Sequence, residues 1–281
     1  MTPAEVSWAE VYYEMVDYFY WDPRTLGQKK YADSRLKTLD AVMDHIRKIE
    51  VTLNHQIKQF LSLAPLSLRN HLFESALGGE VEVPGDLIMA GASADIDRIY
   101  QLNNTVQPDF LFISDDTTAS LEMKIGAKSS VEQVLKYAFL ALAVEQQQDK
   151  KMQHILAFLG VGDFSNMFRN NIASVASLKR QIETEKHAYF TKLAGRAKRF
   201  QAWESRYFEI LESLYIGFIS YWSFADLLRS EMPSLDGSPG AEVYRNLTIG
   251  MLRELESRGL ANCNETLPVA NHAVPSLVGT L

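Results

Sequence analysis

Three ionisable side chains in the middle of the chain could together hold a divalent metal ion. Asp109 begins one strand-like run, and Glu122 and Lys124 lie two residues apart in the next run. The intervening DDTT segment at 115–118 has turn-forming residues. A hairpin with a two- or four-residue loop there sets Asp109 opposite Lys124 and Leu111 opposite Glu122, so the three ionisable side chains share one face of the sheet. An odd-length loop would move Asp109 to the other face.

A cluster of this kind would favour a bound cation. Two carboxylates at about 4 Å repel each other by roughly 4 kcal/mol at an effective dielectric constant near 20. Lys124 offsets part of this repulsion, and a divalent cation would offset more. Mg²⁺ in proteins is held by one or two carboxylates together with waters and substrate phosphates. The alternative is a strand whose Glu-x-Lys pair lies in water, which is the ordinary explanation of such a pair on its own.

The order of the polar residues resembles the motif of the PD-(D/E)XK nuclease superfamily. A Pro-Asp pair at 108–109 is followed, after twelve intervening residues, by the Glu-Met-Lys triplet at 122–124. The Gln and Tyr at 133 and 137 resemble the Gln-x-x-x-Tyr motif of the RecB-like branch of that superfamily. The resemblance covers roughly residues 67 to 163. It implies a restriction-endonuclease-like α/β core, in which a small mixed sheet is flanked by helices, with N- and C-terminal helical extensions.

The resemblance also implies an activity and a set of roles. The implied enzyme depends on Mg²⁺ or Mn²⁺ and hydrolyses phosphodiester bonds. Asp109 and Glu122 would bind the metal with the help of the backbone carbonyl of Met123. Lys124 would position the attacking water or stabilise charge that builds up on the phosphate oxygens.

Gln133 and Tyr137 are implied to contact the substrate. They lie four residues apart and therefore share one face of a helix. Gln133 also has a structural explanation, because Ser130 and Gln133 have the spacing of a capping box that would close the first helical turn. We favour the substrate-binding interpretation because of the resemblance.

A further acid is implied on the helix that precedes the sheet, and Glu74 is the candidate. Glu74 lies nearly opposite an apolar stripe of its helix, yet Phe73 and Leu77 flank it. An ordinary surface glutamate is the alternative. Other acids could take the same role before the hairpin begins: Glu80, Glu82, Asp86, Asp95 and Asp97.

The pattern of apolar residues divides the chain into three regions. Residues 1–66 are predicted to form a helical N-terminal arm, 67–165 the nuclease-like core, and 166–281 a helical C-terminal region. In the core we expect helices over 67–77 and 130–148 and strands over 85–89, 110–114, 119–125 and 154–161. This alternation indicates a small mixed sheet covered on both faces. Farther on, a stripe from Phe208 to Phe218 has helical spacing, and the last helices have the order of a winged helix-turn-helix or of plain helix packing.

The composition is that of an ordinary globular protein. The 281 residues carry a formal net charge of −7 and one cysteine, Cys263. A single cysteine excludes an internal disulfide and favours a reducing compartment. The longest apolar stretch, 137–144, is too short to cross a bilayer, and the N-terminus lacks the pattern of a signal peptide. We therefore expect a cytoplasmic protein with no membrane partner.

The negative charge argues against a protein that coats nucleic acid by bulk electrostatics. In contrast to the negative net charge of the whole chain, one segment is locally basic and contains Lys179, Arg180, Lys186, Lys192, Arg196, Lys198 and Arg199. It could face a phosphate backbone, or it could be the solvated face of a helix.

No competing chemistry has a motif in the sequence. Zinc-ligand spacing, a Walker loop, a dinucleotide fingerprint and a Gly-x-Ser-x-Gly elbow are all absent. The resemblance to the PD-(D/E)XK superfamily implies a nuclease that acts on DNA rather than RNA, in bacterial or phage DNA processing or antiviral defence. The helical regions would supply substrate choice, a homodimer contact or docking to a protein partner. One alternative keeps the activity: a nuclease subunit of a larger machine, such as a transposon-end cutter with a C-terminal winged helix. The others are a non-catalytic nucleic-acid-binding or scaffold subunit of a larger complex, and a helical interaction protein in which the motif match is accidental.

Overall fold

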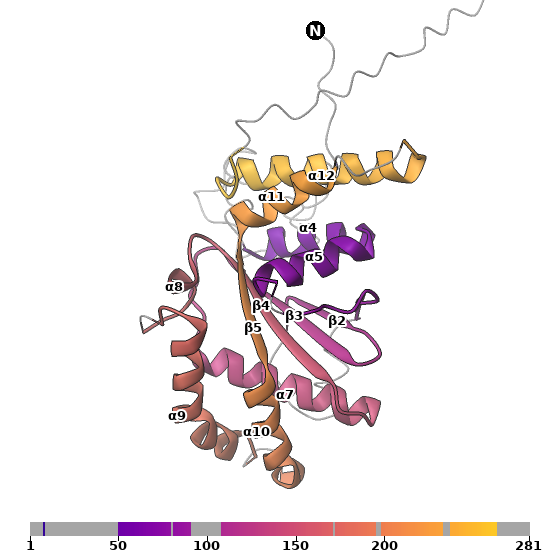
Figure 1. Ribbon diagram of the computed structural model, residues 1–281. Helices are drawn as coiled ribbons and strands as arrows, with labels where there is room; N and C mark the ends of the chain where they lie inside the picture. The colour runs from indigo at the N-terminus through magenta and orange to yellow at the C-terminus, as the bar shows by residue number, and fades with distance from the viewer. Residues whose placement is uncertain are drawn as a thin grey trace, which may run out of the picture.

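The computed structural model describes Trp8 and residues 50–79, 81–90, 108–170, 172–194, 198–232 and 237–262. In these ranges a five-stranded sheet with the order β1-β2-β3-β4-β5 lies between two layers of helices (Figure 1). The predicted small mixed sheet flanked by helices is therefore confirmed. Most of the predicted N-terminal arm, Cys263, and the rival acids Glu80, Asp95 and Asp97 lie outside the described residues.

The sheet is antiparallel on one side and parallel on the other. Its strands are β1 (Ile88–Met89), β2 (Phe110–Ile113), β3 (Thr117–Lys124), β4 (Gln153–Gly160) and β5 (Tyr215–Ser220). The pairs β1–β2 and β2–β3 are antiparallel, whereas β3–β4 and β4–β5 are parallel. Strand β4, which lies between β3 and β5, is almost wholly buried, as expected for a parallel strand covered on both faces. The predicted strands over 110–114, 119–125 and 154–161 are confirmed to within a few residues, and the one over 85–89 is reduced to β1.

One helical layer consists of α4 (Glu50–Leu63), α5 (Leu66–Ala76), α11 (Tyr221–Glu231) and α12 (Pro239–Ser257). The opposite layer consists of α7 (Val131–Gln148), α9 (Val175–Ala194) and α10 (Glu204–Ser213), with the short α8 (Phe164–Met167) and η1 (Lys198–Trp203) beside it (Figure 1). Alternate residues of the strands enter two apolar cores. Phe110 and Leu121 pack on the α4 side, and Leu111 and Leu156 on the α7 side. The predicted helices over 67–77 and 130–148 are confirmed as α5 and α7.

The register of the β2–β3 hairpin differs from the predicted one by two residues. Ser114 N donates to Thr117 O at 2.9 Å, so the turn is Asp115-Asp116. Leu111 pairs with Ser120 rather than with Glu122, and the same register continued by one residue sets Asp109 opposite Glu122 rather than Lys124. The predicted pairs are therefore wrong. Because side chains alternate with a period of two, however, the shift of two residues keeps all three ionisable side chains on one face.

The predicted helical stripe from Phe208 to Phe218 is correct only in its first part. Helix α10 ends at Ser213, and Tyr215–Ser220 forms the edge strand β5. Gly217 allows this strand to approach the end of α5, because a Cβ there would lie 2.6 Å from the carbonyl oxygen of Ala76. The sheet thus extends beyond the predicted domain boundary at residue 165. In the described part of 221–262 there are two helices and no strand, so no wing is seen.

Candidate metal centre at the end of strand β3

Four elements bring polar side chains together at the carboxyl end of β3. Asp109 immediately precedes β2, and Glu122 and Lys124 come from β3 itself. Helix α7 begins a few residues after β3 and presents its first turns to the same face of the sheet. The start of α4 approaches the same strand end. The three ionisable residues that the sequence singled out are therefore brought together.

Glu122 is the centre of this cluster, and its side chain is buried, with the residue only 3% exposed. Its Oε1 lies 2.7 Å from Lys124 Nζ and accepts from Gln133 Nε2 at 3.3 Å. Its Oε2 accepts a hydrogen bond from the hydroxyl of Tyr137. Both oxygens are thus held in place, one turn of α7 supplying two of the three donors.

Gln133 therefore does not close a capping box. Ser130 is the N-cap of α7, but its side chain makes no capping hydrogen bond. The Gln133 backbone N–H donates to the Ser130 carbonyl at 3.0 Å, while the Gln133 side chain points toward Glu122. Tyr137 is 3% exposed and uses its hydroxyl on the same carboxylate. Both residues belong to the site, where their side chains contact the carboxylate of Glu122.

Asp109 is held at both carboxylate oxygens. Oδ2 accepts from the backbone N–H of Met123 at 2.8 Å, and Oδ1 accepts from Asn54 Nδ2 at 2.7 Å. Burial, and then the negative charge of Glu122, raise the pKa of the Asp109 carboxyl to about 7, although the Met123 N–H and Lys124 act in the opposite direction. The charged form of Asp109 is thus unfavourable in the protein alone and would be favoured by an added cation.

Lys124 carries the positive charge of the cluster. Besides Glu122, it contacts Glu50 at the start of α4, with Nζ 3.3 Å from Oε1. Burial lowers the pKa of Lys124, but the carboxylates of Glu122, Glu50 and Asp109 together raise it above its ordinary value. The ammonium group therefore stays charged at neutral pH.

Glu50 and Asn54 are site residues that the sequence did not reveal. Glu50 Oε2 also accepts from the backbone N–H of Ile125 at 3.3 Å, so α4 is tied to the end of β3. The two residues lie four apart on one face of α4, beside the buried Leu53 and Ile57 of the same face. Two polar residues within the apolar stripe of this helix are the signal that could have indicated them.

Glu74, the predicted acid of the preceding helix, is not brought to the cluster by any contact. It lies half-buried on α5, and its side chain makes no hydrogen bond or ion pair with the described residues of the site. Its role as a metal ligand stays a prediction. The acid that reaches the cluster from a preceding helix is Glu50.

The donor set suits a hard divalent cation that keeps some of its waters. Among the described residues, no three His, Cys, Asp or Glu side chains are close enough to enclose an ion by themselves. Asp109 and Glu122 nevertheless share one face, and the carboxylates of Asp109, Glu122 and Glu50 outnumber the single ammonium group. Two carboxylates with waters and a phosphate are the coordination that Mg²⁺ prefers. The residues therefore fit Mg²⁺ or Mn²⁺ better than a fully enclosed metal.

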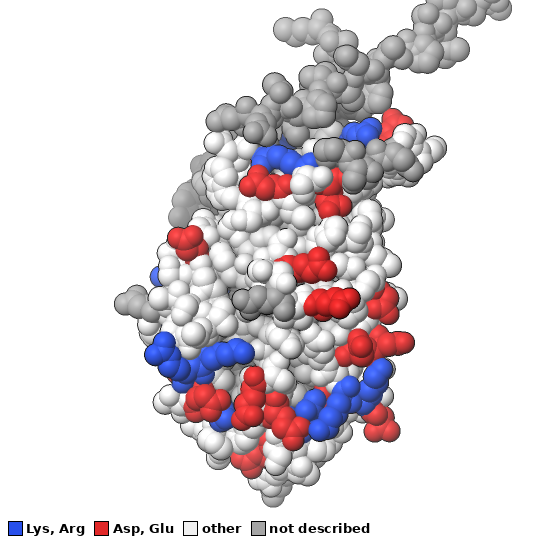
Figure 2. Space-filling model, viewed as in Figure 1, with Lys and Arg blue, Asp and Glu red and all other residues white. Residues whose placement is uncertain are grey.

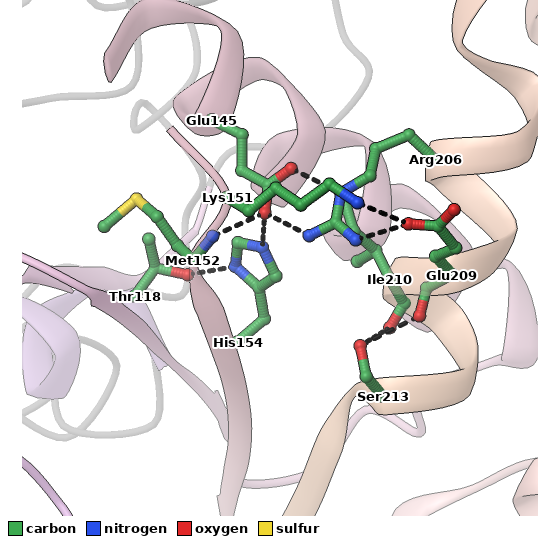
Figure 3. Close-up of polar contacts among 9 residues, drawn as sticks. All are labelled: Thr118, Glu145, Lys151, Met152, His154, Arg206, Glu209, Ile210 and Ser213. Carbon is green, nitrogen blue, oxygen red and sulfur yellow. Dashed lines mark hydrogen bonds and ion pairs between the residues drawn. The ribbon is translucent and has the colours of Figure 1, made fainter. Parts of the chain in front are cut away.

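A second buried polar cluster, which the sequence reasoning missed, lies at the other end of α7. Glu145 accepts from the Met152 backbone N–H at 2.7 Å and from Arg206 Nε at 2.7 Å, and His154 Nε2 lies 3.0 Å from its Oε1 (Figure 3). His154 Nδ1 in turn lies 2.7 Å from the Thr118 hydroxyl. The Glu145 carboxylate can only accept, so the proton of the neutral His154 imidazole lies on Nε2. Nδ1 is then left to accept a hydrogen bond from the Thr118 hydroxyl.

Thr118, His154 and Glu145 have the order of a hydroxyl–imidazole–carboxylate triad, but they lack room for a substrate. All three residues are buried, with His154 only 2% exposed. The cavity beside Thr118 and His154 measures about 10 Å³, which is the space of about one water molecule. The cluster instead ties α7, β4 and α10 together, so we assign it to stability.

Two of the four described side chains in the basic cluster predicted over 179–199 are paired with acids. Lys186 contacts Glu183 at 2.7 Å, and Lys192 lies 3.9 Å from Glu132. Figure 2 shows basic and acidic side chains interleaved on the lower part of the face in view. Arg196 and the side chains of Lys198 and Arg199 lie outside the described residues. The paired charges favour a solvated helix face over a track for phosphates.

Comparison of the chain with models of protein families, with curated proteins and with solved structures finds no match. Within the described ranges, no helix is both long and apolar enough to span a membrane.

Proposed function

We propose that this protein is a Mg²⁺- or Mn²⁺-dependent nuclease that hydrolyses phosphodiester bonds in DNA, on a restriction-endonuclease-like core. The observation that supports this most directly is the convergence on Glu122. Lys124 on the same strand and Gln133 and Tyr137 on α7 all donate to its carboxylate, and Asp109 shares its face. An accidental match of short motifs gives no reason for these residues to meet.

The metal would be held by Asp109, Glu122 and the backbone carbonyl of Met123. Glu50 is the third acid of the cluster and would act directly or through a water, the role first expected of Glu74. A cation bound there polarises the scissile phosphate and lowers the pKa of a coordinated water. The neighbouring carboxylates keep Lys124 charged, so that its ammonium group can orient the attacking water or stabilise charge on the phosphate oxygens.

Gln133 and Tyr137 serve this chemistry by fixing the Glu122 carboxylate. Because a buried hydroxyl cannot also reach a substrate, we assign Tyr137 to positioning Glu122, and Gln133, which is half-buried, to the same task at the rim. Such hydrogen bonds to a metal-binding carboxylate set its orientation and its basicity.

The net charge of −7 makes metal-bridged phosphate contacts the main source of affinity for DNA, since the described basic side chains on α9 are partly neutralised. The resemblance of the motif to that of the PD-(D/E)XK nuclease superfamily also suggests a setting. This setting would be bacterial or phage DNA processing, including antiviral defence, in the cytoplasm. The N- and C-terminal helical regions would provide the homodimer or partner contacts.

One observation favours a second candidate, a non-catalytic nucleic-acid-binding or scaffold subunit. The Glu122 carboxylate already accepts from three donors within the protein, and no three described acidic or imidazole groups enclose an ion. A cluster of this kind could hold β3 to α7 without any metal. The two candidates differ in whether the protein takes up a cation and turns over a substrate.

The test is a cleavage assay on single- and double-stranded DNA and RNA with Mg²⁺, with Mn²⁺ and with chelator. Glu122→Gln and Lys124→Met should each abolish metal-dependent cleavage. Lys186→Met is a matched control, because it removes another ion-paired lysine of low exposure, on α9. Equal cleavage by the wild type and both site variants would mean a contaminant, and binding without turnover by the wild type would support the scaffold.

A further inference from the structure

The Asp109 carboxylate accepts hydrogen bonds from donors on two different elements. Met123 supplies its backbone N–H from β3, and Asn54 supplies its side-chain amide from α4, at 2.8 and 2.7 Å. The first donor belongs to the strand itself and cannot be changed without altering the sheet. The second is a side chain that reaches the site from the opposite helical layer. Asn54 is therefore the donor to Asp109 that a single substitution can remove.

The amide of Asn54 is oriented for Asp109 at the expense of its own carbonyl. Its Oδ1 is buried and has no hydrogen-bond partner among the described residues. Turning the amide over would bring Oδ1 against Asp109 Oδ1, so that two acceptors would face each other. An unpaired buried carbonyl is unfavourable and uncommon in native structures. Its presence here indicates that holding the Asp109 carboxylate decides the orientation of the side chain.

Anchoring α4 to the sheet is the competing explanation of this hydrogen bond. That anchor is already provided by apolar packing, because Leu53, Ile57, Phe60 and Leu61 are fully buried against the core of the α4 layer. Glu50 also ties the start of the same helix to Ile125. The hydrogen bond from the half-buried Asn54 amide is therefore not needed to hold α4 against the sheet.

We propose that Asn54 is a positioning residue for the candidate metal centre: it fixes the Asp109 carboxylate in the orientation in which it would bind the cation. This inference rests on the proposed function. Asp109 has room for such a ligand, because its two hydrogen bonds use only about half of the acceptor positions of a carboxylate. Partners of metal-binding side chains change metal affinity or activity by about 10- to 100-fold when they are removed.

The experiment compares Asn54→Leu with Asn70→Leu in the full-length chain. Leucine has the branched shape of asparagine and a good helix propensity, but it is larger and offers no donor. Asn70 is a matched control, because it is a half-buried asparagine on the neighbouring helix α5 whose Oδ1 is likewise buried without a partner. Mn²⁺ and Mg²⁺ binding is measured by titration calorimetry, the melting temperature is measured in chelator, and cleavage is measured against metal concentration.

Asn54→Leu should weaken Mn²⁺ binding 10- to 100-fold and raise the metal concentration for half-maximal cleavage by the same factor. Cleavage at saturating metal should recover most of the wild-type rate, and Asn70→Leu should bind metal as the wild type does. If Asn54→Leu melts earlier in chelator but binds Mn²⁺ with wild-type affinity, Asn54 is only a structural anchor and the inference is wrong. Asn54→Ala repeats the measurement should the leucine variant not fold.

The two levels of proposal fail in different ways. A wild-type protein that takes up neither cation and cleaves nothing would overturn the proposed function, and this inference with it. A wild-type protein that binds Mn²⁺ and cleaves, beside an Asn54→Leu variant that is indistinguishable from it, would overturn only the role of Asn54.

Discussion

Replacing Asp109 by asparagine should stabilise the protein when no metal is present. The carboxyl of Asp109 has its pKa raised from 3.8 to about 7 by burial and by Glu122. One pKa unit corresponds to 1.36 kcal/mol. A shift of about three units therefore destabilises the folded state by at most about 4 kcal/mol at pH 8, where the carboxyl is charged in both states. Relaxation of Lys124 lessens this cost, so a gain of at least about 1 kcal/mol is expected for Asp109→Asn.

The surrounding hydrogen bonds can accept this change. The new carbonyl oxygen would accept from the Met123 N–H in place of Oδ2. The new amide group would face Asn54, whose own amide can turn over so that its unpartnered Oδ1 becomes the acceptor. The substitution thus removes a buried charge, and the one unpaired polar group there changes from the Asn54 carbonyl oxygen to the Asn54 amide nitrogen.

Urea unfolding in chelator, from pH 4 to pH 8, is the assay. Because the folded-state pKa lies above the unfolded one, the folded wild type holds this proton more tightly, and its stability relative to Asp109→Asn falls as pH rises from about 4 to about 7. The advantage of the variant should therefore be largest at pH 8 and vanish near pH 4. Asp86→Asn, at an exposed position, should change little. A variant less stable than the wild type at pH 8 would refute the reasoning, because Asp109 would then be well accommodated as a charge.

Two further predictions concern the acids of the helices and the buried histidine. Glu50→Gln should lower metal-dependent cleavage at least tenfold, whereas Glu74→Gln should leave it within twofold of the wild type, since only Glu50 contacts Lys124; the reverse order would restore Glu74 as the ligand. Burial lowers the pKa of His154 below 6.5, so the stability that its neutral form contributes is present above pH 6.5 and is lost as pH falls through the folded-state pKa. His154→Gln should therefore lose less stability than the wild type between pH 7.5 and pH 5 in urea unfolding, and an equal loss would show that His154 does not titrate there.

The sequence was sufficient to predict the hairpin and the shared face of its ionisable residues, although not the register, because the signals for both features are local. Turn residues at 115–118 and the alternation of apolar side chains place Asp109, Glu122 and Lys124 on one face for any loop of even length. The register itself depends on which two residues make the turn. Ser114 settles this by donating its backbone N–H to the Thr117 carbonyl, while its hydroxyl accepts from Thr117 N at 3.1 Å. That side-chain contribution has no distinct sequence signature among several turn-forming residues.

The parts that sequence reasoning missed depend on contacts between distant segments. Glu50 and Asn54 meet β3 only because α4 packs across the sheet, and helical spacing within α4 does not reveal that contact. The strand β5 follows α10 without a break in the apolar pattern. Its helical spacing over Leu211, Leu214 and Tyr215 is as good as that of α10, and pairing with β4 overrides it.

The polar cluster at the end of β3 is difficult to explain as a device for stability alone. Burying an ion pair seldom stabilises a fold more than apolar residues of the same volume would, and three carboxylates around one lysine leave the cluster with excess negative charge. The second buried cluster is different, because Arg206 binds both oxygens of Glu145 and lowers the pKa of that carboxyl despite its burial. Within the described residues, the charges of the Glu145 cluster are therefore matched, whereas the acids of the cluster at the end of β3 outnumber its single lysine. A cation is the simplest ligand that would balance the cluster at the end of β3, and this excess of negative charge is the physical reason to test that site first.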